Sequence, residues 1–196
     1  MVPKTESIDD VQEFRAALGR AGAPDRMGIW CLIETPLGVL NAPSIAEAGK
    51  TAFGVQAIGV GTNDLTKEMQ CTAVPGRAPL AFALSTIVTS AKAYGLTVLD
   101  GVFNNTSDLE GFTVEARQAR DLGFDGKTLI HPNTVAACHA AFAPTEAEIV
   151  WAERVVEAMA AAKAVGEGVS TVDGQLIEEL HAVQARRVLA KAAAVS

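Results

Sequence analysis

The sequence contains little that would bind nucleic acid, cross a membrane or form disulfide bonds. Among its 196 residues, 16 Lys and Arg stand against 23 Asp and Glu, a net charge of −7, and aromatic residues make up 5%. Phosphate backbones are bound by clustered Lys and Arg, so this balance indicates no nucleic-acid partner. No stretch approaches the roughly 20 consecutive apolar residues of a membrane span, so we expect no membrane association.

Cysteine is also scarce. Cys31, Cys71 and Cys138 are an odd number without a Cys-x-x-Cys pair, and the N-terminus has no apolar signal-peptide core. These features favour a reducing, cytoplasmic location. The 49% hydrophobic content excludes a disordered chain. The length fits an ordinary domain but falls short of the roughly 250 residues of a closed (β/α)₈ barrel.

Short apolar runs bounded by turn residues predict β-strands. Their continuous hydrophobicity is typical of strands buried on both faces of a parallel sheet. Met1-Val2-Pro3 resembles the end of a further strand, which makes about five strands in all. The four full runs are Gly28–Ile33, Val55–Val60, Leu96–Leu99 and Lys127–Ile130.

Helical patterns separate these runs, which predicts an α/β fold built from βα units. After Ile130 the pattern becomes helical, and we divide the chain into residues 1–142 and 143–196. Residues 166–171 are expected to form a flexible joint. The predicted helices are Ser7–Gly19, Pro79–Ala93, Asp108–Leu122 with Gly123 as C-cap, Asn133–Phe142, Thr145–Val165 and Gln175–Ala194.

Two carboxylates follow neighbouring strands at the point where each strand ends. Glu34 comes after Cys31-Leu-Ile33, and Asp64 comes after a glycine-containing loop that begins at Gly59. Mg²⁺ takes one or two carboxylates, keeps waters and leaves positions for a bidentate substrate, so this pair suits a magnesium site. The alternative, equally open from position alone, is that each residue caps a following helix.

Other polar residues at strand ends are less specific. Asp100 could line the same pocket, although Asp-Gly is an ordinary turn pair and the turn is favoured. His131 could be a base or ligand contact, or a strand-to-helix corner before Pro132. His139 and His181 indicate packing or surface positions, and no His or Cys spacing supports zinc.

Several segments in order resemble the HpcH/HpaI aldolase and citrate lyase superfamily of CoA-ester lyases. The resemblance covers nearly the whole chain and implies a Mg²⁺-dependent carbon–carbon lyase on a (β/α)₈ TIM barrel, here with about five C-terminal βα units and a C-terminal helical lid. The segments are Val2–Glu6, Ile33–Asn41, Gly59–Leu65, Leu99–Val102, Leu122–Pro132 and Val172–Ile177.

The resemblance also implies residue roles. Glu34 and Asp64 correspond to the residues that bind the metal and, through it, the keto acid. Asp173 corresponds to the catalytic acid/base carried on a lid from a neighbouring subunit, which implies a homo-oligomer, a trimer or larger. Ile130 and His131 lie in the loop near the CoA arm.

The chain departs from the family pattern in three ways. Asn63 precedes Asp64 where many members have Glu, and Leu180 stands where a Pro often follows the lid motif. The resemblance begins at the family's fourth strand, and the family keeps the arginine that holds the substrate carboxylate before that point. Arg26 precedes a strand and Arg77 is expected in a loop, so neither replaces it.

The leading hypothesis is cleavage of a 3-hydroxyacyl-CoA ester of the malyl-CoA, citramalyl-CoA or citryl-CoA type to an acyl-CoA and a keto acid. A second hypothesis is a catalytically inactive paralogue that serves as an interaction module. A third is phosphotransfer, because Gly61–Thr66 also resembles the Mg²⁺ site of phosphoenolpyruvate-using dikinases.

Overall fold

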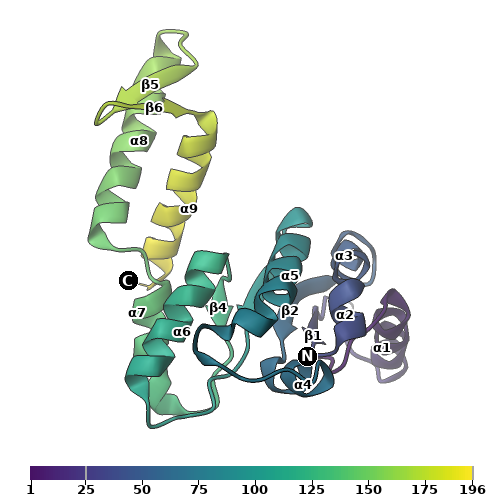
Figure 1. The fold of residues 1–196 in the computed structure, drawn as a ribbon. Helices are drawn as coiled ribbons and strands as arrows, with labels where there is room; N and C mark the ends of the chain where they lie inside the picture. Colours follow the sequence, from purple (N-terminus) through teal and green to yellow (C-terminus); the bar gives the residue numbers. More distant parts are fainter. Residues whose placement is uncertain (25, 196) are drawn as a thin grey trace. The chain divides into compact units, whose positions relative to one another are not determined.

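A four-stranded parallel sheet organises the first of two compact units in the computed structural model, which describes residues 1–24 and 26–195. The units are Met1–Phe142 and Ala143–Ser196. The sheet has the order β1-β2-β3-β4 (Figure 1). Its strands are β1 (Ile29–Ile33), β2 (Val55–Val60), β3 (Thr97–Asp100) and β4 (Gly126–Lys127).

Helices connect the strands, which confirms the predicted α/β fold. The first unit contains α1 (Ile8–Arg20), α2 (Pro36–Leu40), α3 (Ala42–Glu47), α4 (Thr62–Glu68), α5 (Ala81–Ala93), α6 (Leu109–Leu122) and α7 (Val135–Phe142). Short 3₁₀ segments are η1 (Ala48–Lys50), η2 (Pro75–Leu80) and η3 (Pro132–Thr134). The predicted strand stub is also present, because Val2 forms a parallel bridge with Cys31.

The two faces of β1 differ in burial, whereas residues 57–60 of β2 are buried on both faces. Cys31 pairs in register with Ile58, and Ile58 with Val98, and these three side chains are fully buried in the main hydrophobic cluster. Helix α5 packs on β2 and β3, and α1 packs on β1. On the opposite face Trp30 is 41% exposed and Leu32 is half-buried. The expectation that the strands are buried on both faces is therefore wrong for β1.

Local signals fix the helix ends where the sequence predicts them. The Ser7 hydroxyl accepts a hydrogen bond from the Asp10 amide while the Asp10 carboxylate accepts from the Ser7 amide, which is a capping box. Asp108 caps α6 at its start. Gly123 ends α6 with φ 101°, a left-handed conformation that glycine adopts without strain.

The C-terminal unit differs from the sequence prediction. It contains α8 (Glu146–Ala164), β5 (Val169–Val172), β6 (Gln175–Glu178) and α9 (Glu179–Val195), with β5 and β6 antiparallel. The predicted joint at 166–171 is thus partly strand, and the predicted helix from Gln175 begins four residues later. Asp173 and Gly174, with φ 50° and 77°, form the turn between the strands, which is typical of two-residue hairpins.

Apolar packing holds this hairpin against its two helices. Val172 and Ile177 are buried in one cluster with Val155 and Met159 of α8 and Ala182 of α9. Figure 1 shows α8 and α9 side by side, and the two helices are in extensive contact. This cluster explains why residues 169–178 form a hairpin, because alternate side chains of the two strands pack on the apolar surface of α8 and α9.

No helix in the described part of the chain has the length and apolar content that crossing a bilayer would require.

The predicted fourth strand is shorter than expected. Only Gly126 and Lys127 pair with β3, and residues 128–130 leave the ladder. Ile130 is 58% exposed. An apolar run alone does not distinguish a paired strand from an extended segment that continues beyond it.

The reactivity of the Cys31 thiol tests whether the main hydrophobic cluster is packed as described. Its side chain is fully buried, and burial raises the pKa of the thiol to about 11. The thiolate is the reactive form, so at pH 8 we expect iodoacetamide to modify the half-buried Cys71 and to leave Cys31 unmodified in the native protein. Peptide mass mapping measures both sites, and labelling in urea is the control. Equal labelling rates in the native protein would contradict this packing.

Candidate functional site

Glu34 lies at the carboxyl end of β1 and is 6% exposed. Its Oε1 accepts a hydrogen bond of 2.9 Å from the Lys4 amide. The N-cap of the next helix, α2, is Thr35, whose hydroxyl accepts from the Gly38 amide at 3.1 Å. Glu34 therefore does not cap a helix, so the alternative role considered from sequence is wrong.

Gly61 brings the Glu34 carboxylate against the segment that carries Asp64. The Gly61 amide donates to the Ile33 carbonyl at 2.9 Å, which joins the ends of β1 and β2. A Cβ on Gly61 would lie 2.4 Å from Glu34 Oε2, so only glycine permits this approach. Gly61 is also the N-cap of α4, and Asp64 lies in its first turn rather than at the cap.

These positions suit a hard cation. A buried carboxylate and a half-buried one come from adjacent strand ends, and the turn between them has no side chain at Gly61. Within residues 1–24 and 26–195 no group of three or more His, Cys, Asp or Glu side chains is placed to hold a metal. Two carboxylates are nevertheless sufficient for Mg²⁺, which usually keeps several waters. The magnesium site stays a prediction.

The Asp100 side chain forms a buried ion-pair cluster that joins parts of the fold, and its interpretation as a turn residue is wrong. It is fully buried at the end of β3. Arg77 Nη1 donates to both of its carboxylate oxygens at 2.8 Å, and Lys127 Nζ donates to Oδ2 at 2.8 Å. Lys127 also donates to Glu115 on α6 at 2.7 Å. The sequence offered no signal for this cluster, because its members lie far apart along the chain.

Arg77 is the functional candidate that sequence reasoning missed. It was expected in a loop, but it lies within η2, is 8% exposed and has a left-handed φ of 52°. A non-glycine residue persists in that conformation only when its surroundings hold it there, and the contacts to Asp100 do so. Its Nη2 is buried without a hydrogen-bond partner.

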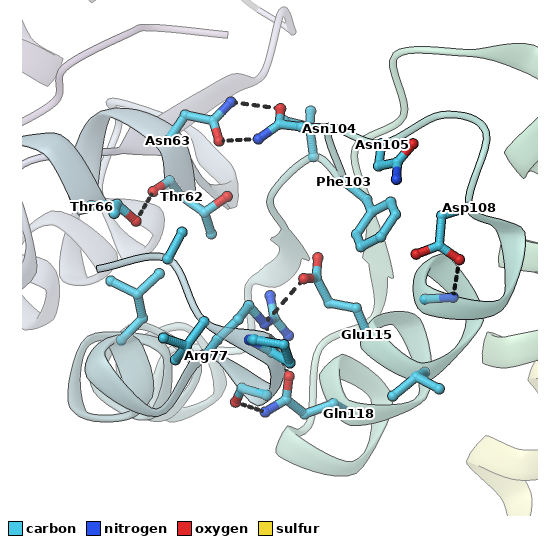
Figure 2. Close-up of a pocket in the computed structure, with 18 of the residues that line it drawn as sticks. Thr62, Asn63, Thr66, Arg77, Phe103, Asn104, Asn105, Asp108, Glu115 and Gln118 are labelled. Carbon is cyan, nitrogen blue, oxygen red and sulfur yellow. Dashed lines mark hydrogen bonds and ion pairs between the residues drawn. The ribbon is translucent and has the colours of Figure 1, made fainter. Parts of the chain in front are cut away.

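A cavity of about 860 Å³ lies between η2, the start of α4 and α6, and Figure 2 shows Arg77 and Glu115 facing one another within it. We call it the η2–α6 pocket. Glu34 and Asp64 are not among its lining residues, although Thr62 and Asn63, which precede Asp64 in α4, are.

His131 and Ile130 lie at the end of the segment after β4. The His131 ring Nδ1 accepts a hydrogen bond from the Asn133 amide at 3.3 Å and caps η3, so the strand-to-helix corner predicted as one alternative is present. Both side chains are exposed. His139 is exposed as well, and His181 Nδ1 accepts from the Glu178 amide at 3.0 Å.

Asp173 lies in the C-terminal unit, at the tip of the β5–β6 hairpin, and its side chain is 55% exposed. Arg154 of α8 donates Nη1 to Oδ2 at 2.7 Å and Nη2 to Oδ1 at 2.6 Å, a bidentate pair. These hydrogen bonds, and then the charge of Asp173, raise the pKa of Arg154. The carboxylate is thereby presented on a defined turn.

The chain is similar to known proteins over nearly its whole length. The family described as HpcH/HpaI aldolase/citrate lyase matches residues 1–132, and the chain belongs to this family. It is 41% identical over 196 residues to a (3S)-malyl-CoA thioesterase of Cereibacter sphaeroides, covering all of this chain and 65% of that protein. It is 33% identical to the citrate lyase subunit beta of Escherichia coli K12, covering 97% of this chain and 64% of that one.

The chain is also similar to solved structures of citrate lyase proteins. CitE of Mycobacterium tuberculosis, in complex with magnesium, acetoacetate and coenzyme A, has a TM-score of 0.74 and 29% identity, covering 97% of this chain and 66% of that one. A citrate lyase of Burkholderia xenovorans has a TM-score of 0.80 at 24% identity, covering 98% of this chain and 62% of that one, and shows the fold alone. The chain thus spans about two thirds of the length of these relatives.

The buried cluster gives a stability prediction. Asp100→Ala leaves the buried cations Arg77 and Lys127 with Glu115 as their one remaining carboxylate partner, so we expect it to lower the free energy of unfolding by about 3–5 kcal/mol. Urea unfolding measures the loss. The control is Lys92→Ala, which removes the exposed pair with Asp125 and should cost less than about 1 kcal/mol. A similar small loss in both variants would refute the assigned role of Asp100.

Proposed function

We propose that this chain carries the metal-binding part of a Mg²⁺-dependent carbon–carbon lyase that cleaves a 3-hydroxyacyl-CoA ester to an acyl-CoA and a keto acid. The observation that carries the proposal is the placement of Glu34 and Asp64 at adjacent strand ends, with Gly61 against the Glu34 carboxylate. In the proposed architecture, residues 1–142 are part of a (β/α)₈ barrel and residues 143–196 form a helical lid.

Glu34 and Asp64 are the residues that would hold Mg²⁺ and, through it, the keto acid. Their oxygen ligands match a hard cation, and the hydrogen bond from the Lys4 amide orients Glu34. When bound, the ion supplies Lewis-acid polarisation of the keto acid carbonyl. The magnesium and keto-acid complexes of relatives such as M. tuberculosis CitE support this assignment.

Asp173 is the proposed acid/base. In the cleavage direction the acyl-CoA leaves as an enolate, and Asp173 would deliver a proton to its α-carbon; in the reverse direction it would remove that proton. Its exposed position on a packed hairpin suits a group that reaches a site outside its own unit. We propose that the lid serves a neighbouring subunit of a cytoplasmic homo-oligomer.

The exposed Ile130 and His131 would contact the CoA arm. Both follow β4 at the same edge of the sheet as the ends of β1 and β2, because the strands are parallel. A thioester substrate bound through Glu34 and Asp64 would extend from that edge. The family membership favours this lyase chemistry over phosphotransfer.

Hydrolysis of the thioester is a second candidate function. The (3S)-malyl-CoA thioesterases of C. sphaeroides match the whole chain at 40–41% identity, above the 33% of the E. coli citrate lyase subunit. Cleavage of malyl-CoA by a lyase yields glyoxylate and acetyl-CoA, whereas hydrolysis yields malate and a free thiol. The two reactions are therefore separated by their products.

Metal binding can be tested without turnover. We expect Glu34→Gln and Asp64→Asn each to weaken Mn²⁺ binding, used as a paramagnetic substitute for Mg²⁺, by at least about tenfold, because each removes an anionic ligand. Electron paramagnetic resonance titration of free Mn²⁺ measures it. Asp9→Asn, an exposed aspartate in the first turn of α1, is the matched control and should change nothing. Unchanged affinity in either site variant would remove the metal assignment.

The reaction is tested by incubating the purified protein with malyl-CoA and Mg²⁺ while glyoxylate and free thiol are measured in parallel. Glyoxylate supports the lyase, and thiol without glyoxylate supports the thioesterase. We expect Asp173→Asn to lower the lyase rate by on the order of 10²-fold or more. Glu179→Gln, an exposed acid in the same unit, is the control. Absence of both products would favour the inactive interaction module.

A further inference from the structure

The chain that precedes α1 runs parallel to β1 and contains a bulge. The Leu32 amide donates to the Val2 carbonyl at 2.8 Å. In a regular parallel ladder the Leu32 carbonyl would then accept from the amide two residues after Val2, which is that of Lys4. It accepts instead from the Thr5 amide at 3.1 Å, so one extra residue is inserted opposite β1.

The bulge turns the Lys4 amide away from the ladder and toward the proposed metal site. This N–H donates to Glu34 Oε1 at 2.9 Å. Lys4 has a left-handed φ of 46°, and the next residue, Thr5, is fully buried. A non-glycine residue keeps that conformation only where its surroundings hold it, and such residues cluster at functional sites. The bulge therefore fixes the Lys4 backbone against the carboxylate that would hold the metal.

Lys4 shares one edge of the sheet with both proposed metal ligands. The chain before α1 is parallel to β1, and β1 is parallel to β2. Their carboxyl ends therefore meet, with Lys4 at the first, Glu34 at the second and Asp64 just after the third. The Lys4 side chain is exposed, and it forms no ion pair with any residue in the described ranges 1–24 and 26–195. Its ammonium group, on a flexible four-carbon stem, is free to bind a ligand at this edge.

The loaded site would carry an excess negative charge. Mg²⁺ brings two positive charges, which the carboxylates of Glu34 and Asp64 balance. A keto acid bound to the ion adds a third carboxylate, so one negative charge is left over. The buried cations at the end of β3 are already paired with Asp100. Lys4 has an unpaired charge and a backbone contact to a proposed metal ligand, so it is placed to supply the missing cation.

We propose that Lys4 binds the carboxylate of the keto acid held on the Glu34–Asp64 metal, with the ammonium Nζ donating to a carboxylate oxygen. This inference rests on the proposed function and adds a substrate-binding residue to it. A hydrogen bond between two charged groups is among the strong ones. The backbone amide of Lys4 orients Glu34 and its side chain neutralises the substrate, and the two roles are separable by substitution.

The experiment measures Mn²⁺ binding and pyruvate binding separately on the full chain. Electron paramagnetic resonance gives the affinity for Mn²⁺, and calorimetric titration of the Mn²⁺-saturated protein gives the affinity for pyruvate. Lys4→Gln keeps the backbone amide and removes the charge. We expect it to weaken pyruvate binding by at least about tenfold. Mn²⁺ binding should be unchanged or tighter, because a nearby cation repels the metal.

Two further variants serve as controls. Lys4→Arg keeps the positive charge and should bind pyruvate within about threefold of the parent protein. Lys50→Gln removes an exposed cation from η1, which precedes β2 and lies toward the amino ends of the strands, and it should change neither affinity. All three variants should melt like the parent protein.

Pyruvate affinity that is unchanged in Lys4→Gln, or that falls equally in Lys4→Arg or Lys50→Gln, would overturn this inference. Loss of Mn²⁺ and pyruvate affinity together in Lys4→Gln would show a role for the backbone alone and would also overturn it. A parent protein that binds Mn²⁺ but no pyruvate overturns it and leaves the metal site in place. Failure of the proposed function is distinct: Mn²⁺ would then bind without dependence on Glu34 and Asp64, or not at all, and both proposals would fall.

Discussion

The first unit depends on how one fully buried carboxylate is neutralised. Asp100 lies at the end of β3, and a lone carboxylate there would be strongly destabilising. Arg77 approaches from η2 and Lys127 from β4, and Lys127 also binds Glu115 of α6. One charge therefore connects four segments. It also accounts for the left-handed backbone at Arg77, which the contacts to Asp100 hold in place.

Sequence signals predicted those parts of the fold that short-range chemistry determines. Ser7 and Gly123 mark helix ends through contacts within a few residues, and the apolar runs of β1 and β2 are long enough to identify. The cluster around Asp100 was not predictable, because its partners lie 23 and 27 residues away and Asp-Gly is an ordinary turn pair. A buried Arg77 likewise has no signature in a Pro- and Gly-containing segment.

The C-terminal hairpin is a second place where local sequence signals predicted the wrong structure. Gly166 and Gly168 predicted a flexible joint, and the alanine-rich sequence after Gln175 predicted a helix. The structure has β5 and β6 instead, because Val172 and Ile177 pack against an apolar surface of α8 and α9. Tertiary packing overrides local propensity there. The placement of Glu34 and Asp64 at adjacent strand ends was predictable, because parallel strand ends meet at one edge by topology, and their metal role stays a prediction. The contact of Gly61 with Glu34 could be found only in the structure.

If the proposed function is right, Arg154 must release Asp173 during the reaction. The candidate metal ligands are in one compact unit and the candidate acid/base is in the other, so the chemistry requires Asp173 to enter a site outside its own unit. Its carboxylate is held by two charge-assisted hydrogen bonds from Arg154, and both groups are about half exposed. Solvent weakens such a pair, so its exchange for a substrate contact costs little. An aspartate buried as Asp100 is could not make that exchange. The exposure of Asp173 therefore suits a carboxylate proposed to act in another site. The burial of Asp100 suits a carboxylate that holds parts of the fold together.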